Sequence, residues 1–314
     1  MKIYYSKEKI FYLIFVSLFF VLSPLKVSYP QLMEGFVTVD GENRTFVLYY
    51  PNVSENSTLP LLMVFHGHGG EGYQIMNATG FNDIADREKF AVVYPDGMNK
   101  RWNDGRREPA ENTKYDDVKF VNLLIEKLAK NFHIDTTRIF ATGMSNGGIF
   151  SFYLAYKLSN KILAIAPVAA NIPDNIIEEY KPEFPISLLL INGTADKLIK
   201  YDGGEVGFSK SKYRGKTIST DESIESFVKL NNCSPVPDIE KLLDTDGEDG
   251  CVAIKYSYSG GINNANVVLL KVFNGGHTWP GGTQYLPKIL VGNVCRDFSA
   301  SEVIWNFFKS VQSR

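Results

Sequence analysis

Residues 138–156 read RIFATGMSNGGIFSFYLAY, an apolar stretch followed by a turn with glycine and serine and then by a second apolar stretch. The first stretch is typical of a short buried strand, and the second repeats its apolar residues at helical spacing. Ser145 is therefore expected at the carboxyl end of a strand and at the N-terminus of a helix. Gly143 and Gly147 fit such a strained turn because it leaves no room for bulky neighbours.

The pattern G-x-S-x-G at residues 143–147 predicts that Ser145 is a catalytic nucleophile. Glycine and serine are common in any loop, so the five residues alone also fit an ordinary turn. The strand before them and the helix after them favour the catalytic interpretation.

A second apolar strand, residues 61–65, runs into the glycine-rich turn HGHGG at residues 66–70. Acyl transfer builds negative charge on a carbonyl oxygen, and each backbone N–H aimed at that oxygen lowers the barrier by roughly 3 kcal/mol. We expect the N–H of Asn146 and one N–H of this turn to form the oxyanion hole, with His68 as the first choice and Gly69 as the second. His66 is interpreted as a brace of the turn.

A serine hydroxyl needs a histidine to take its proton. Of the four histidines, His66 and His68 belong to the turn, and His133 precedes the strand of the nucleophile. His277 follows the apolar strand 267–273 and lies in a loop rich in glycine, so it is the predicted base.

A carboxylate must orient that histidine, and it should lie between Ser145 and His277 in the order Ser, Asp, His. Asp196 leaves the carboxyl end of a buried strand at residues 185–191, where reactive groups of such sheets gather. Asp196 is the predicted acid. Asp202, further along the same loop, remains an alternative.

Four blocks of the chain carry a family resemblance: residues 66–70, 115–120, 141–148 and 276–282. Together they resemble the secreted esterases grouped as polyhydroxybutyrate depolymerases and feruloyl esterases, from about Gly35 to the C-terminus. The resemblance implies an α/β-hydrolase fold, with a mostly parallel central sheet and helices on both faces. It also implies the same roles for Ser145, Asp196 and His277.

The composition fits one enzyme domain at residues 33–314, because 314 residues with 44% hydrophobic side chains can bury a large core. A net charge of -2 argues against nucleic acid as a partner. The sequence contains no P-loop, dinucleotide fingerprint or paired C-x-x-C pattern, so we expect no cofactor and no metal.

Residues 1–28 are predicted to be a signal peptide, because lysines precede an apolar run at residues 10–22 that is short for a membrane span. Secretion is the expected outcome. The alternative is an uncleaved signal anchor, which is the one way in which a membrane would be a partner.

Two further sets of residues have predicted roles. Cys233 and Cys251 flank a polar stretch and are expected to form a disulfide after export, which leaves Cys295 as a small buried side chain. Trp102 and Trp279 lie in glycine-containing loops and are candidates for substrate binding, with loop packing as the alternative.

These observations predict a secreted serine carboxylic-ester hydrolase that forms an acyl-enzyme. The expected substrates are feruloyl or acetyl esters of plant polysaccharide, or hydroxyalkanoate oligomers of a polyester. The alternatives are a serine peptidase of similar fold and a secreted non-catalytic binding protein on a hydrolase scaffold.

Overall fold

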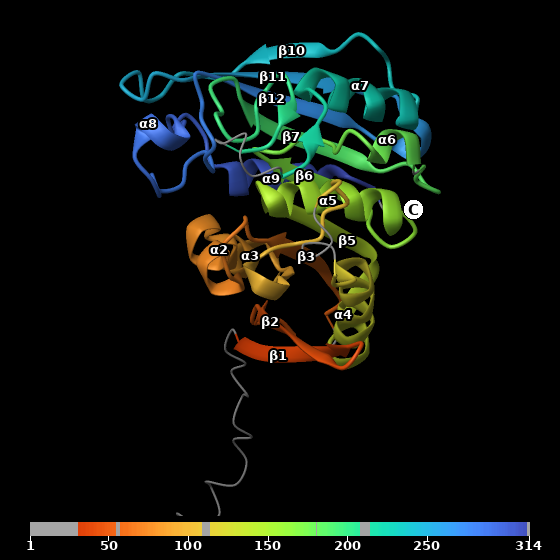
Figure 1. Ribbon diagram of the computed structural model, residues 1–314. Coiled ribbons are helices and arrows are strands. Elements are labelled where there is room, and N and C mark those ends of the chain that lie inside the picture. The colour runs from red at the N-terminus through yellow and green to blue at the C-terminus, as the bar shows by residue number, and fades with distance from the viewer. Residues whose placement is uncertain (1–30, 55–56, 109–113, 180, 208–213, 313–314) are drawn as a thin grey trace, which may run out of the picture.

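A ten-stranded sheet forms the centre of the computed structural model, which describes residues 31–54, 57–108, 114–179, 181–207 and 214–312 (Figure 1). The strand order is β1-β2-β4-β3-β5-β6-β7-β12-β11-β10. The strands from β4 to β12 in this order run parallel, and the pairs beyond them at both ends are antiparallel. The expected mostly parallel central sheet is therefore confirmed.

The strands of this sheet have the following bounds: Gln31–Val39 (β1), Glu42–Tyr50 (β2), Leu59–Phe65 (β3), Ala91–Pro95 (β4), Ile134–Met144 (β5), Ala164–Val168 (β6), Ser187–Gly193 (β7), Asp238–Lys241 (β10), Val252–Tyr258 (β11) and Val267–Phe273 (β12). A separate small pair consists of Gly204–Glu205 (β8) and Lys216–Thr217 (β9).

Helices cover both faces of the sheet, as the sequence predicts. One face packs against Asp117–Asn131 (α4), Asn146–Lys157 (α5) and Thr220–Asn231 (α7). The other packs against Gly72–Thr79 (α2), Phe81–Glu88 (α3) and Ala300–Ser310 (α9). Two short helices, Ile176–Glu179 (α6) and Lys288–Val291 (α8), lie in connections.

The two faces bury separate hydrophobic clusters because side chains alternate along each strand. In β3, Leu61 and Met63 belong to one cluster, and Leu62 and Val64 belong to the other. All four are fully buried. Burial of one such side chain contributes about 1.5–3 kcal/mol, so this strand is a central element of the core.

The parallel arrangement decides where reactive side chains meet. The strands β3, β5, β7 and β12 run in the same direction, so their carboxyl ends share one edge of the sheet. The loops that leave this edge begin at His66, Ser145, Thr194 and Asn274. Every loop to which the sequence assigns a catalytic residue therefore starts here.

The N-terminal end of α4 uses two adjacent aspartates. The side chain of Asp116 caps the helix and accepts a hydrogen bond from the N–H of Lys119 at 2.8 Å. Asp117 pairs with Arg44 of β2 at 2.5 Å, and both side chains are almost completely buried. Asp117 also accepts the N–H of Asn103 at 2.7 Å, so it ties the helix to the loop after β4.

Replacement of Asp117 by alanine is expected to lower the free energy of unfolding by about 3–5 kcal/mol, because it leaves the guanidinium of Arg44 buried without its partner. Denaturant unfolding followed by circular dichroism measures this. Glu225→Ala, which removes an exposed pair with Lys229, is the control and should leave stability nearly unchanged. A loss for Asp117→Ala no larger than that of the control would contradict the assigned importance of the buried pair.

The predicted signal segment, residues 1–28, lies outside the described residues. Within the part of the chain that is described, no helix has the length and apolar character needed to cross a membrane.

Candidate active site

Ser145 occupies a sharp turn between the end of β5 and the start of α5. Its backbone has φ 60° and ψ -123°, a conformation that costs a non-glycine residue energy. The turn is held because the N–H of Ser145 donates to the carbonyl of Val168 at 3.0 Å. A Cβ on Gly147 would lie 2.2 Å from the carbonyl oxygen of Phe65, so α5 can approach β3 this closely only with glycine at that position.

The glycine-rich turn after β3 lies directly against Ser145. A Cβ placed on Gly67 would be 3.5 Å from the Cβ of Ser145. Among the described residues, neither the N–H of His68 nor the N–H of Asn146 has a hydrogen-bond acceptor. Asn146 is also the first residue of α5, where the helix dipole favours negative charge.

His66 braces this turn through both ring nitrogens. Its Nε2 accepts the N–H of Gly97 at 2.9 Å, so the proton lies on Nδ1, which donates to the carbonyl of Gly67 at 2.8 Å. Burial lowers the pKa of His66 and keeps the ring neutral. Both nitrogens are occupied, so His66 is not free to take a proton from Ser145.

Trp102 does not line the pocket, which corrects its prediction as a substrate-binding residue. The side chain is fully buried and stacks on Phe150 with ring centroids 5.0 Å apart. Its indole N–H donates to the carbonyl of His66 at 2.9 Å, and its backbone N–H donates to the side chain of Asn146 at 2.8 Å. Trp102 therefore holds the segments of His66 and Asn146 next to Ser145. A glycine-containing loop in the sequence does not indicate that the tryptophan side chain points into the core.

His277 and Asp196 meet at the same edge of the sheet. The Nδ1 of His277 lies 2.7 Å from Oδ2 of Asp196, and both side chains are buried. The other oxygen of Asp196 accepts the backbone N–H groups of Leu198 and Ile199 at 2.8 and 2.9 Å, which fixes the carboxylate. Asp202, the alternative acid, is exposed and has no hydrogen bond to His277 in the described part of the chain.

Backbone contacts fix the loop of His277. The N–H of His277 donates to the carbonyl of Val291 at 2.5 Å, and the N–H of Gly276 donates to the carbonyl of Asn293 at 2.9 Å. A Cβ on Gly276 would lie 2.0 Å from the oxygen of Val291, so no other residue fits there. The hydroxyl of Tyr285 donates to the carbonyl of His277 at 3.1 Å; partial burial and the nearby Asp196 raise the pKa of Tyr285 to about 12.

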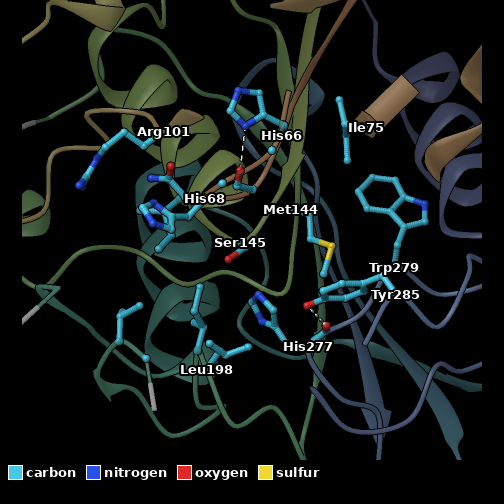
Figure 2. Close-up of a pocket in the computed structure, with 18 of the residues that line it drawn as sticks. His66, His68, Ile75, Arg101, Met144, Ser145, Leu198, His277, Trp279 and Tyr285 are labelled. Atoms are coloured by element: carbon cyan, nitrogen blue, oxygen red, sulfur yellow. Dashed lines mark hydrogen bonds between the residues drawn. The ribbon is translucent and has the colours of Figure 1, made fainter. Parts of the chain in front are cut away.

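A cavity of about 910 Å³ opens at this edge, and both Ser145 and His277 reach into it. Figure 2 shows the hydroxyl of Ser145 and the ring of His277 facing each other across the pocket. The apolar part of the lining comes from four separate segments: Ile75, Ala78, Met144, Ile149, Leu198, Ile199, Val206, Trp279 and Leu286.

Trp279 lines the pocket, in contrast to Trp102, and its indole edge is anchored. Its Nε1–H donates to the hydroxyl of Ser301 at 3.0 Å, and that hydroxyl donates to the carbonyl of Thr79 at 2.6 Å. The wall at Trp279 therefore depends on α9 and on the end of α2. The sequence predicts Trp279 as a candidate for substrate binding, but no sequence pattern indicates the hydrogen bonds through Ser301 to Thr79.

Charged side chains also line the pocket. Arg101 and Arg106 both pair with Glu108, and Arg214 lies nearby. Burial lowers the pKa of His68, and these arginines lower it further, so His68 is neutral near pH 7. No sequence motif marks these arginines as pocket residues, although Arg101 and Arg106 lie on either side of Trp102 in the chain.

The structure does not bring Cys233 and Cys251 together, which corrects the predicted disulfide. Cys233 follows α7 and packs into the cluster on the α4, α5 and α7 face. Cys251 precedes β11 and packs into the cluster on the opposite face, together with Cys295. The sheet separates the two cysteines, and a spacing argument along the chain cannot show on which face a side chain lies.

Residues 44–171 match the family model described as Esterase PHB depolymerase. This segment of the chain is therefore similar to the esterases of that family. The protein is similar to NocK of Nocardia uniformis subsp. tsuyamanensis, whose name describes it as an esterase. The two are 28% identical over 86% of this chain and 80% of NocK. It is also similar to the bifunctional acetylxylan esterase/xylanase XynS20E of Neocallimastix patriciarum, with 32% identity over 58% of this chain and 25% of that protein.

Further relatives of the esterase are named feruloyl esterases. The chain spans most of NocK but only a quarter of the length of XynS20E. A solved structure of a dienelactone hydrolase-like phosphotriesterase from metagenomic libraries, P91, matches with a TM-score of 0.56 and 11% identity, over 90% of this chain and 99% of that chain. This likeness confirms the α/β-hydrolase fold, and the named relatives place the esterase among carboxylic ester hydrolases.

Proposed function

We propose that this protein hydrolyses carboxylic esters through a triad of Ser145, His277 and Asp196. The observation that carries the proposal is the 2.7 Å hydrogen bond between Asp196 and Nδ1 of His277 beside the pocket that contains Ser145. With Nδ1–H donated to the carboxylate, Nε2 carries a lone pair and can accept the proton of the serine.

In this mechanism, the Oγ of Ser145 attacks the ester carbonyl while Nε2 of His277 takes its proton. The negative oxygen of the tetrahedral intermediate accepts hydrogen bonds from the N–H groups of Asn146 and His68, which have no acceptor among the described residues. His277 then gives the proton to the leaving alcohol. Water then attacks the acyl-enzyme while His277 takes its proton, and His277 returns that proton to the Oγ of Ser145 as the carboxylic acid leaves.

Asp196 stays ionised during the cycle. It holds His277 in the tautomer with the proton on Nδ1 and stabilises the imidazolium that forms during each proton transfer. Its own position is fixed by the backbone N–H groups of Leu198 and Ile199.

The proposed substrates are feruloyl or acetyl esters of plant polysaccharide, or hydroxyalkanoate oligomers. The cavity of about 910 Å³ is large enough for an aryl acyl group, since ligand pockets of drug-sized molecules span about 300–1,000 Å³. Relatives named acetylxylan esterase and feruloyl esterase support this class of substrate. With such a substrate, and with residues 1–28 as an export signal, the protein would act outside the cell.

Hydrolysis of a panel of p-nitrophenyl esters and methyl ferulate, beside matched anilides, tests the reaction. We expect turnover of esters and covalent addition of one phosphonyl group from a fluorophosphonate, which reacts with an activated serine and releases fluoride. Peptide mass spectrometry should locate the group on Ser145.

Three outcomes would count against the proposal. Turnover of anilides without turnover of esters would favour a peptidase. Absence of both turnover and labelling would favour a binding protein on a hydrolase scaffold. Labelling at another serine would mean that the nucleophile is misassigned.

A further inference from the structure

Two buried cysteines and one aspartate gather on the sheet face opposite Cys233. The Sγ atoms of Cys251 and Cys295 and a carboxylate oxygen of Asp249 all lie within 4.8 Å of one another. All three residues are buried. The proposed ester hydrolysis uses none of them.

The carboxylate of Asp249 accepts hydrogen bonds from two backbone N–H groups. Oδ1 accepts the N–H of Cys251 at 2.6 Å, and Oδ2 accepts the N–H of Arg296 at 2.5 Å. These bonds hold the two cysteine-bearing segments side by side. Within this cluster of described residues, only the two sulfur atoms are free of such bonds, which is fewer than the four ligands that a structural zinc site uses.

The thiols themselves have weak partners. The Sγ of Cys251 lies 3.9 Å from the carbonyl of Asp249, and the Sγ of Cys295 lies 3.7 Å from a carboxylate oxygen of Asp297. The neighbouring Cys295 thiol, together with burial, raises the pKa of Cys251, so this thiol is not a reactive nucleophile in the folded protein.

From this placement, we propose that Cys251 and Cys295 form a structural disulfide when the chain folds in the presence of a disulfide donor such as oxidised glutathione. The thiolate of one cysteine attacks the donor and releases a first reduced thiol. The second cysteine then attacks the mixed disulfide, the S–S bond of the protein forms, and a second reduced thiol leaves. The two cysteines lose two electrons and two protons, which the donor accepts.

The disulfide would brace the loop of the proposed base. Cys295 belongs to the segment whose carbonyl groups hold that loop: Val291 accepts from His277, Asn293 from Gly276, and Cys295 itself from Gly281 at 2.8 Å. Cys251 precedes β11, which pairs with β12, the strand that leads into the His277 loop. The cross-link would therefore join the back of this loop to the sheet.

Cys233 is excluded from the pair by its position. Its Sγ contacts the carbonyl of Ala265 at 3.4 Å, on the other side of the sheet. A folded oxidised protein should therefore keep one thiol, at Cys233. This pairing differs from that expected from the sequence, so a peptide map distinguishes the two.

The test is refolding of the purified protein from denaturant in a glutathione redox buffer. Thiols are then counted in denaturant, and peptides are mapped by mass spectrometry without reduction. We expect one free thiol per chain and a peptide pair that links Cys251 to Cys295. Oxidation should raise Tm by about 5 °C or more over the reduced protein.

Matched variants make the stability measurement specific. The difference in Tm between oxidised and reduced protein should disappear in Cys251→Ala and in Cys295→Ala and should remain in Cys233→Ala. This readout needs no ester hydrolysis, so it does not depend on the proposed function. If either alanine variant does not fold, the peptide map of the unmutated protein decides alone.

Three results would overturn the proposal. The first is three free thiols after refolding in the oxidising buffer. The second is a linked peptide that contains Cys233. The third is one zinc ion per chain that protects Cys251 and Cys295 from alkylation, which would make the cluster a metal site.

Discussion

Ser145→Ala is expected to lower kcat for the best ester of the panel by a factor of 10³ or more. The variant keeps the pocket and the oxyanion-hole donors but has no oxygen to form the acyl-enzyme, and nucleophile removal in a serine hydrolase has a cost of this order. KM should change little, because the serine hydroxyl contributes little to ground-state binding. Initial rates at several ester concentrations, with Tm as a check of folding, measure both effects.

Ser151→Ala is the matched control for this variant. Ser151 lies further along α5, and its hydroxyl donates to the carbonyl of Gly147 at 2.9 Å without reaching the pocket. Its removal should cost about 1 kcal/mol of stability and leave most of kcat. Equal activity of Ser145→Ala and the unmutated protein would rule out the acyl-enzyme mechanism.

Asp196→Asn is expected to lower kcat by about 10⁴, the size of effect known for this change in a serine triad. The amide oxygen can still accept the N–H groups of Leu198 and Ile199, so the loop should keep its shape. The amide nitrogen, however, would donate to Nδ1 of His277 and leave the proton on Nε2. In that tautomer His277 cannot accept the proton of Ser145, and activity should not recover between pH 6 and 9.

Asp202→Asn tests which of the two candidate carboxylates, Asp196 or Asp202, orients His277. Asp202 is exposed and makes no hydrogen bond to His277 among the described residues, so its change should alter kcat by less than about a factor of three. A large loss in Asp202→Asn with full activity in Asp196→Asn would reverse the assignment of the acid.

The sequence predicts the central part of this fold well, for identifiable reasons. Parallel strands buried on both faces are continuous apolar runs, such as residues 61–65 and 267–273, and glycines mark the turns that follow them. A reactive residue directly after such a run must lie at the shared carboxyl edge. Ser145, Asp196 and His277 all follow this rule, and the structure places all three at that edge.

The features that the sequence did not predict depend on the direction of a side chain. Trp102 and Trp279 have the same loop context, yet one is buried behind the glycine-rich turn and the other lines the pocket. The same holds for the three cysteines. The sheet separates Cys233 from Cys251 and Cys295, and the spacing along the chain does not show this. Such differences arise from contacts between segments far apart in the chain, which local patterns do not encode.

The anchoring of Trp279 through Ser301 to Thr79 has a consequence for the biosynthesis of the protein. Ser301 lies in α9 and Thr79 is the last residue of α2, so the two residues are 222 positions apart in the chain. A ribosome has produced the serine, the histidine and the aspartate before it produces the helix that secures this wall of the pocket. The nascent chain therefore contains all three residues of the proposed triad before the wall at Trp279 is anchored, and that anchoring must wait until α9 has been synthesised and has docked.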